Sequence, residues 1–249
     1  MLRVCLFVLL CLSASTAHAA SVRVGVASNF GPTMMRLAKA FDAETGHRTE
    51  VMAGSSGALF AQIVNGARFD LFLSADAARP KALVEAARAQ PQHHVPYAFG
   101  ALALWSRKAA GFDTQESVRT YLQRLPGRQL AIANPDLAPY GKAARETLVA
   151  LKSANVAFVR GQNVSQTFAL VVTGNAQAGF VAASQLDSVH LGAVWAVPPS
   201  LHAPIRQDMV LLSRAQHNPA ATALFHYIQS PAGRALIAKS GYHVPAEGR

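Results

Sequence analysis

The hydrophobic pattern of the chain is organised around the segment 51–76. An extended run ends at Met52, a small polar turn follows at 54–57, and apolar residues then recur every three or four positions, as on one face of a helix. The apolar run 69–73 has the composition of a buried parallel strand. The pattern therefore predicts strand, turn, helix and strand, with Ser56 in the turn that opens the helix.

The same order of strand, polar turn and helix recurs three more times along the chain. In each case an apolar run of four to six residues ends in a short polar segment, and an amphipathic pattern follows. The predicted strands and the residues at the start of the following helices are 22–27 with Ser28 and Asn29, 129–133 with Tyr140, and 157–160 with Val164.

The start of each predicted helix is a place where an anion could bind. The first N–H groups of a helix have no partner within it, and the helix dipole is positive there. A single Ser56 in this position is more often an N-cap, but four such turns favour a ligand site. The strand–helix–strand order predicts parallel sheets, whose ligands lie beyond the carboxyl ends of the strands. We therefore predict two α/β lobes with a cleft between them.

The rest of the pattern predicts a helix over 80–89, a polar surface loop over 90–96 and one long strand over 97–106. His93 and His94 lie in the predicted loop without an acidic or third ligand nearby, so a metal site is not expected. Further strands are predicted at 178–182 and 205–212, and further helices at 115–125, 219–229 and 231–240.

The first twenty residues read as a secretory signal peptide. They contain a positive residue, a short apolar core and an A-x-A cleavage site that ends at Ala19, with cleavage expected after Ala19 or Ala20. Cys5 and Cys11 both lie in this segment. The mature chain is therefore expected to have no disulfide and no cysteine nucleophile.

The formal net charge of +10 indicates a basic exterior that could help to collect anions. The basic residues are scattered and are not interleaved with aromatic residues, so nucleic acid is not an expected partner. The chain also lacks the G-x-S-x-G, S-x-x-K, H-E-x-x-H and phosphate-loop motifs of enzymes. We therefore expect a binding protein and not an enzyme.

Several segments together resemble the periplasmic molybdate-binding proteins, the solute receptors of ABC importers. The resemblance implies two α/β lobes of type II, each a mostly parallel sheet flanked by helices, with the ligand between them. The expected organisation is a removed signal peptide (1–20), lobe 1 (21–98 and 206–249) and lobe 2 (99–205). The resembling segments are ASNF at 27–30, GSSGALFAQI at 54–63, NGARFDLFLSAD at 65–76, AIANPDLAPYGKAARE at 131–146, GQNVSQTF at 161–168, GFVAASQL at 179–186 and PIRQDMVLL at 204–212.

The same resemblance implies a set of ligand-binding residues at the four turns. Serine and asparagine would donate through side chain and backbone, and tyrosine and valine through backbone N–H groups. Some family members add a tyrosine in the strand that matches 178–182, where this chain has Ala182, and Asn29 could supply the missing donor. The implied residues are Ser28, Asn29, Ser56, Tyr140 and Val164.

The resemblance thus implies a periplasmic monomer that binds molybdate or tungstate as an oxyanion, without cofactor or metal ligands, and delivers it to a membrane permease. Two alternatives stay open from the residues. The ligand could be sulfate or phosphate, with Asp70 or Asp76 as an acceptor for a phosphate proton. A secreted serine hydrolase with Ser56 in a Ser–His–Asp triad is the other.

Overall fold

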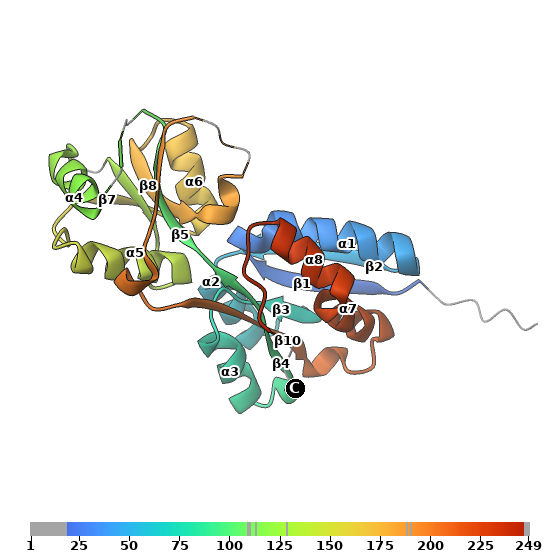
Figure 1. Ribbon diagram of the computed structural model, residues 1–249. Helices are drawn as coiled ribbons and strands as arrows, with labels where there is room; N and C mark the ends of the chain where they lie inside the picture. The colour runs from blue at the N-terminus through green and yellow to red at the C-terminus, as the bar shows by residue number, and fades with distance from the viewer. Residues whose placement is uncertain are drawn as a thin grey trace, which may run out of the picture.

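The computed structural model describes residues 19–108, 111–112, 114–127, 129–187, 189 and 191–246. These residues form two lobes, each with a five-stranded sheet at its centre (Figure 1). The predicted signal peptide 1–20, with Cys5 and Cys11, lies almost entirely outside the described residues.

The sheet of lobe 1 has four strands that run in one direction and one, β10, that runs against them. Three of the parallel strands, β1, β2 and β3, are joined by α1 and α2: α1 connects β1 to its neighbour β2, and α2 connects β2 to β3 on the other side of β1. In spatial order the strands are β2 (Arg48–Gly54), β1 (Ser21–Ala27), β3 (Leu71–Leu73), β10 (Ile205–Leu212) and β4 (Ala89–Gly100).

The sheet of lobe 2 repeats this plan, with β5 as the strand that runs against the other four. The carboxyl ends of its parallel strands therefore lie at one edge, as they do in lobe 1. In spatial order the strands are β7 (Phe158–Gly161), β6 (Leu130–Ala133), β8 (Ala178–Ala182), β5 (Leu102–Ser106) and β9 (Ala193–Ala196).

Helices cover both faces of each sheet, and each face has its own apolar core. In lobe 1, the core under α1, α7 and α8 contains Phe41 and Leu224, and the core under α2 and α3 contains Leu59 and Phe72. In lobe 2, α4 and α5 cover one face and α6 the other. The helices are α1 (Gly31–Thr45), α2 (Ser56–Val64), α3 (Ala78–Glu85), α4 (Gln115–Arg124), α5 (Pro139–Ala150), α6 (Val164–Val172), α7 (Pro219–Gln229) and α8 (Pro231–Lys239).

The chain crosses between the lobes twice, at neighbouring places (Figure 1). It leaves lobe 1 where β4 ends at Gly100 and β5 begins at Leu102, and it returns between β9 and Ile205. The division into 21–98 with 206–249 and 99–205 stays a prediction. Its two boundaries fall near the end of β4 and at the start of β10.

The segment 90–96 is not a loop, as the sequence suggested, but part of the twelve-residue strand β4. Two prolines, Pro91 and Pro96, argued against a strand. However, β4 lies at the edge of the sheet and pairs only with β10 among the described strands, and edge strands tolerate proline. The predicted strand 97–106 is likewise two strands, because Ala101 between them carries the chain from one lobe to the other.

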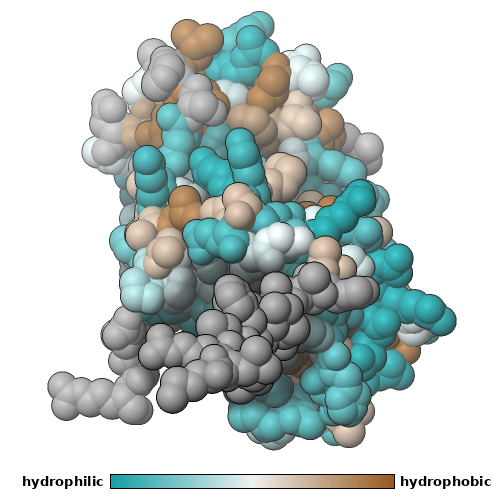
Figure 2. Space-filling model, turned by 90° about the vertical axis from the view of Figure 1, so that its right-hand side faces the viewer, coloured by the Kyte–Doolittle hydropathy of each residue, from teal (hydrophilic) through white to brown (hydrophobic). Residues whose placement is uncertain are grey.

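One face of the protein is mostly polar. Figure 2 shows one face on which hydrophilic residues dominate and apolar residues are scattered. The exposed large apolar side chains include Met35 in α1, Val149 in α5 and Leu191 before β9, which lie in separate parts of the chain. Within the described residues, every helix is too short or too polar to cross a lipid bilayer.

Candidate functional site

A small cavity lies between the lobes, where the carboxyl ends of both sets of parallel strands meet. All five residues predicted to bind a ligand line it, although they come from widely separated parts of the chain. The complete lining is Ala27, Ser28, Asn29, Gly54, Ser55, Ser56, Ala75, Ala138, Pro139, Tyr140, Asn163 and Val164.

The first turn of α2 places two serines at the cavity, and they have different roles. Ser55 is the N-cap, because its hydroxyl oxygen accepts the N–H of Ala58 at 3.4 Å. The hydroxyl oxygen of Ser56 instead accepts the N–H of Ala75 at 2.9 Å. A hydroxyl group that accepts in this way still has its own hydrogen to donate. Ser56 is therefore held with a donor available for a ligand.

The backbone of the same turn also has a donor at the cavity. In the first turn of α2, the N–H of Ala58 goes to Ser55, and the N–H of Gly57 goes to the carbonyl oxygen of Leu137 in lobe 2 at 2.8 Å. The remaining N–H group of that turn belongs to Ser56, which lines the cavity.

The turn after β1 places two of the predicted residues at the cavity. Ser28 and Asn29 line the cavity from a single 3₁₀ turn, Ser28–Phe30. The amide nitrogen of Asn29 donates to Oε1 of Gln207 at 2.9 Å and to the hydroxyl oxygen of Tyr242 at 3.2 Å. Both hydrogens of this amide therefore already have protein acceptors in this conformation, and donation from the Asn29 side chain to an anion stays a prediction. Asn29 is not a helix N-cap, because Ala27 is the N-cap of the 3₁₀ turn and Phe30 is the N-cap of α1.

Tyr140 contributes its backbone to the cavity and its side chain to the contact between the lobes. Pro139 occupies the first position of α5 and has no N–H, so Tyr140 supplies the first N–H of this helix. The phenol is buried next to Gly100, and its oxygen has no hydrogen-bond partner among the described residues. Burial raises the pKa of the Tyr140 hydroxyl well above its ordinary value, and the nearby amides of Gln207 and Asn29 oppose that rise.

Val164 opens α6, and the preceding residue is its N-cap. The side-chain oxygen of Asn163 accepts the N–H of Gln166 at 3.0 Å, and its carbonyl oxygen accepts the N–H of Thr167 at 3.1 Å. The N–H groups of Val164 and Ser165 are the earlier donors of this turn. An apolar valine thus fits a ligand position, because only its backbone is needed.

The cavity is electrically neutral in its side chains: none of the twelve lining residues carries a charge. Asp70 is paired with Arg214 at 2.7 Å and accepts the N–H of Arg23, and Asp76 is paired with Arg79. Neither carboxylate lines the cavity. In the part of the chain that the structure describes, no group of histidine, cysteine and acidic residues could hold a metal ion.

The sequence matches the family model of bacterial extracellular solute-binding proteins over residues 22–243, which is most of the chain. The chain belongs to this family. The members of this family are solute-binding proteins. The chain is not an enzyme, and the serine hydrolase alternative does not apply.

This solute-binding protein is similar to two curated molybdate-binding proteins named ModA. The one from Azotobacter vinelandii is 39% identical, with 93% of each chain covered, and the one from Rhodobacter capsulatus is 39% identical, with 91% of this chain and 89% of that one covered. The solved structure of the periplasmic molybdate-binding protein of Azotobacter vinelandii has a TM-score of 0.83 at 34% identity and covers 90% of this chain and 100% of that one. The resemblance stated from the motifs and the two-lobed fold of type II are thus confirmed.

Sequence reasoning missed two polar cavity residues of this solute-binding protein, Ser55 and Asn163. Both are N-caps, and an N-cap signal could have found them, since each stands directly before the first helical residue. Ala182, in contrast, is buried at the end of β8 and is not among the cavity residues. Its backbone N–H goes to Oε1 of Gln185 at 3.1 Å.

Proposed function

We propose that this protein is a periplasmic receptor for molybdate, and also for tungstate, that delivers the oxyanion to an ABC-type permease in the inner membrane. The observation that carries the proposal is the neutral cavity into which the starts of α2, α5 and α6 and the turn after β1 open. The names of the two relatives at 39% identity support molybdate as the ligand.

The donors proposed to bind the anion are the hydroxyl groups of Ser28 and Ser56 and the backbone N–H groups at Asn29, Ser56, Tyr140 and Val164. Each hydrogen bond from a neutral donor to a charged ligand contributes roughly 1.5–3 kcal/mol. About six such bonds are enough to offset the costs of association and desolvation and to give nanomolar to micromolar affinity. The helix dipoles add to this attraction because their positive ends point to the same place.

Other tetrahedral oxyanions are the alternative ligands. Phosphate at neutral pH still carries a proton and needs an acceptor, but no carboxylate lines the cavity. Sulfate has the same charge and shape as molybdate and differs mainly in size. We therefore expect phosphate to be rejected through the missing acceptor and sulfate through the fit of the cavity.

The location and partners follow from the same proposal. A receptor of this kind works between the outer and the inner membrane, so residues 1–20 would serve as a cleavable signal peptide. We propose that the protein is a monomer, and that a permease encoded elsewhere receives the anion. Amino-terminal sequencing of the secreted protein tests the cleavage after Ala19 or Ala20.

The proposed function is tested by thermal unfolding of the purified protein with molybdate, tungstate, sulfate or phosphate added in turn. A ligand at 100 times its dissociation constant stabilises the folded protein by about 2.7 kcal/mol. We expect a higher melting temperature with molybdate and tungstate only. Stabilisation by sulfate or phosphate without molybdate would contradict the ligand, and no response to any oxyanion would contradict the class of receptor.

A further inference from the structure

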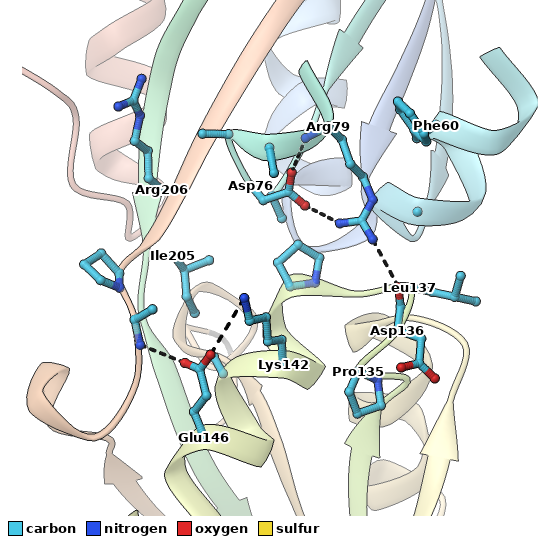
Figure 3. Close-up of a pocket in the computed structure, with 18 of the residues that line it drawn as sticks. Phe60, Asp76, Arg79, Pro135, Asp136, Leu137, Lys142, Glu146, Ile205 and Arg206 are labelled. Carbon is cyan, nitrogen blue, oxygen red and sulfur yellow. Dashed lines mark hydrogen bonds and ion pairs between the residues drawn. The ribbon is translucent and has the colours of Figure 1, made fainter. Parts of the chain in front are cut away.

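A wide groove runs between the lobes on one side of the anion cavity (Figure 3). Lobe 1 lines it with the start of α3, and lobe 2 lines it with the loop before α5 and with α5 itself. Its charged residues are Asp76, Arg79, Asp136, Lys142, Glu146 and Arg206.

Arg79 is the charged residue of this groove whose side chain reaches across to the other lobe. Its Nη2 donates to the backbone carbonyl oxygen of Asp136 at 3.1 Å, as Figure 3 shows. Nη1 of the same guanidinium is paired with Asp76, whose other carboxylate oxygen accepts the backbone N–H of Arg79 at 2.9 Å. Asp76 therefore holds the guanidinium in the direction of lobe 2.

Gly57 makes the neighbouring contact between the lobes. Its N–H donates to the carbonyl oxygen of Leu137 at 2.8 Å. A Cβ atom at position 57 would lie 2.9 Å from that oxygen and 3.0 Å from Nη2 of Arg79, which is closer than side-chain carbons approach such atoms. The absence of a side chain at Gly57 thus lets the loop of lobe 2 reach lobe 1.

These two hydrogen bonds are made to consecutive carbonyl groups of one loop, and the residues that follow this loop line the cavity. Asp136 and Leu137 are followed by Ala138, Pro139 and Tyr140, which all line it. On the other side of the contact, Gly57 follows Ser56, which also lines the cavity. The contacts therefore fix the donors of the two lobes relative to each other.

We propose that Arg79, together with Gly57, forms a clasp that keeps the lobes closed and so sets the rate at which the bound anion is released. This inference rests on the proposed function. Arg79 is a positioning residue here, because it does not line the cavity. Both bonds join one lobe to the other, so they exist only when the lobes are close, and their loss destabilises the closed state without removing an anion donor.

Lys142 offers a matched control in the same groove. It is also a cation, but it pairs with Glu146 at 3.9 Å within its own helix and leaves 72% of its side chain exposed. Replacing either residue removes one positive charge near the anion site. Only the replacement of Arg79 also removes a bond between the lobes, so the pair separates a clasp from simple electrostatic attraction.

The test compares Arg79→Ala, Arg79→Lys, Gly57→Ala and Lys142→Ala with the unchanged protein. Each is loaded with molybdate and then mixed with excess tungstate, and the molybdenum that stays on the protein is measured over time. We expect release about tenfold faster for Arg79→Ala, the scale of one hydrogen bond to a charged group. We expect faster release still for Gly57→Ala, and partial recovery in Arg79→Lys, which keeps the charge but not the planar fork. Lys142→Ala should release at the original rate.

The outcomes separate this inference from the proposed function. If the unchanged protein retains no molybdate, both the proposed function and the proposed clasp are wrong. If it retains molybdate and Arg79→Ala releases it at the original rate, only the clasp is wrong. A lower melting temperature of anion-free Arg79→Ala with unchanged release would show that Arg79 merely stabilises lobe 1, and equal acceleration in Lys142→Ala would show that charge alone matters.

Discussion

At the scale of single residues, several polar side chains at the cavity already make hydrogen bonds within the protein. Ser55 and Asn163 cap helices, and Asn29 is committed to Gln207 and Tyr242. Ser56 is different, because the bond from Ala75 orients its oxygen and leaves its hydrogen to donate. The side chains at the cavity are therefore not interchangeable, although several are serine or asparagine.

This difference predicts how three substitutions affect molybdate affinity or folding stability. Ser56→Ala removes a donor and should weaken binding roughly ten- to a hundredfold, which corresponds to about 1.5–3 kcal/mol. Tyr140→Phe should hardly change affinity, since phenylalanine keeps the backbone N–H and the lost hydroxyl has no partner among the described residues. Ser55→Ala, the matched control, should cost about 1 kcal/mol of stability through the lost cap. Titration calorimetry checks the first two and urea unfolding checks the third. Equal losses of affinity in Ser56→Ala and Tyr140→Phe would contradict the backbone role of Tyr140.

Asn29 should behave as a structural residue. Asn29→Ala removes the amide that bonds to Gln207 and Tyr242, both buried, so the anion-free protein should lose about 1–3 kcal/mol of stability. Affinity for molybdate should fall less than in Ser56→Ala. Urea unfolding of the anion-free protein and calorimetry measure the two effects. Unchanged stability with a large loss of affinity would mean that the amide turns to the anion on binding.

The candidate site could be predicted from the sequence to the level of backbone positions, but not to the level of side-chain orientation. The start of a helix can be predicted from the local pattern, and its free N–H groups can be predicted from helix geometry. The partner of the Asn29 side chain cannot be predicted in this way, because Gln207 lies 178 positions away in the chain. Only the folded arrangement of β10 shows that the Asn29 amide is already used.

At the scale of elements, one of the two crossing segments carries a close contact between the lobes. β4 ends at Gly100, and there the phenol of Tyr140 from lobe 2 packs against lobe 1. The sequence could not indicate this, because a strand was expected to continue through 97–106. The local composition of a strand does not show which sheet the strand joins. The sequence around Ala101, where the chain crosses between the lobes, therefore has the pattern of one uninterrupted strand.

The close approach at Gly100 predicts a pair of coupled substitutions. A Cβ at position 100 would lie 2.1 Å from the phenol oxygen of Tyr140 and 3.0 Å from the ring carbon that bears it. Gly100→Ala should therefore destabilise the closed arrangement of the lobes by about 1–3 kcal/mol and reduce the free energy of molybdate binding by a similar amount. Adding Tyr140→Phe removes the nearer atom, so the double variant should recover part of the loss. Calorimetry on the four proteins of this cycle measures the coupling, and purely additive effects would show that the two positions do not meet.

At the scale of the whole molecule, a buried polar cluster joins the lobes behind the cavity. Tyr242 donates to the carbonyl oxygen of Asn29 at 2.7 Å and accepts from Ser184 of lobe 2 at 3.0 Å, while Tyr97 donates to Gln207 at 3.1 Å. The two-lobed architecture could be predicted from the repeated strand–helix pattern. The cluster could not be predicted, because its members are single residues far apart in the sequence, and no local pattern marks them.

The cluster predicts a loss of stability at alkaline pH. Burial, opposed by hydrogen bonds from Ser184 and Asn29, raises the pKa of Tyr242 to about 12, and burial also raises the pKa of Tyr97 well above its ordinary value. An unfolded tyrosine has a pKa of about 10, so the folded state binds more protons between about pH 10 and 12. The stabilisation is therefore fully present below about pH 10 and is lost as the pH rises toward 12.

The contribution of Tyr242 can be isolated by substitution. Its pKa difference of about two units corresponds to roughly 2–3 kcal/mol across that range. Tyr242→Phe should be less stable than the unchanged protein at pH 8, because Phe cannot donate to Asn29. Its free energy of unfolding should then fall less steeply between pH 10 and 11. Urea unfolding at several pH values measures both slopes. Equal slopes would mean that the Tyr242 phenol reaches solvent as it ionises, and that the cluster does not hold the lobes together in the way its geometry indicates.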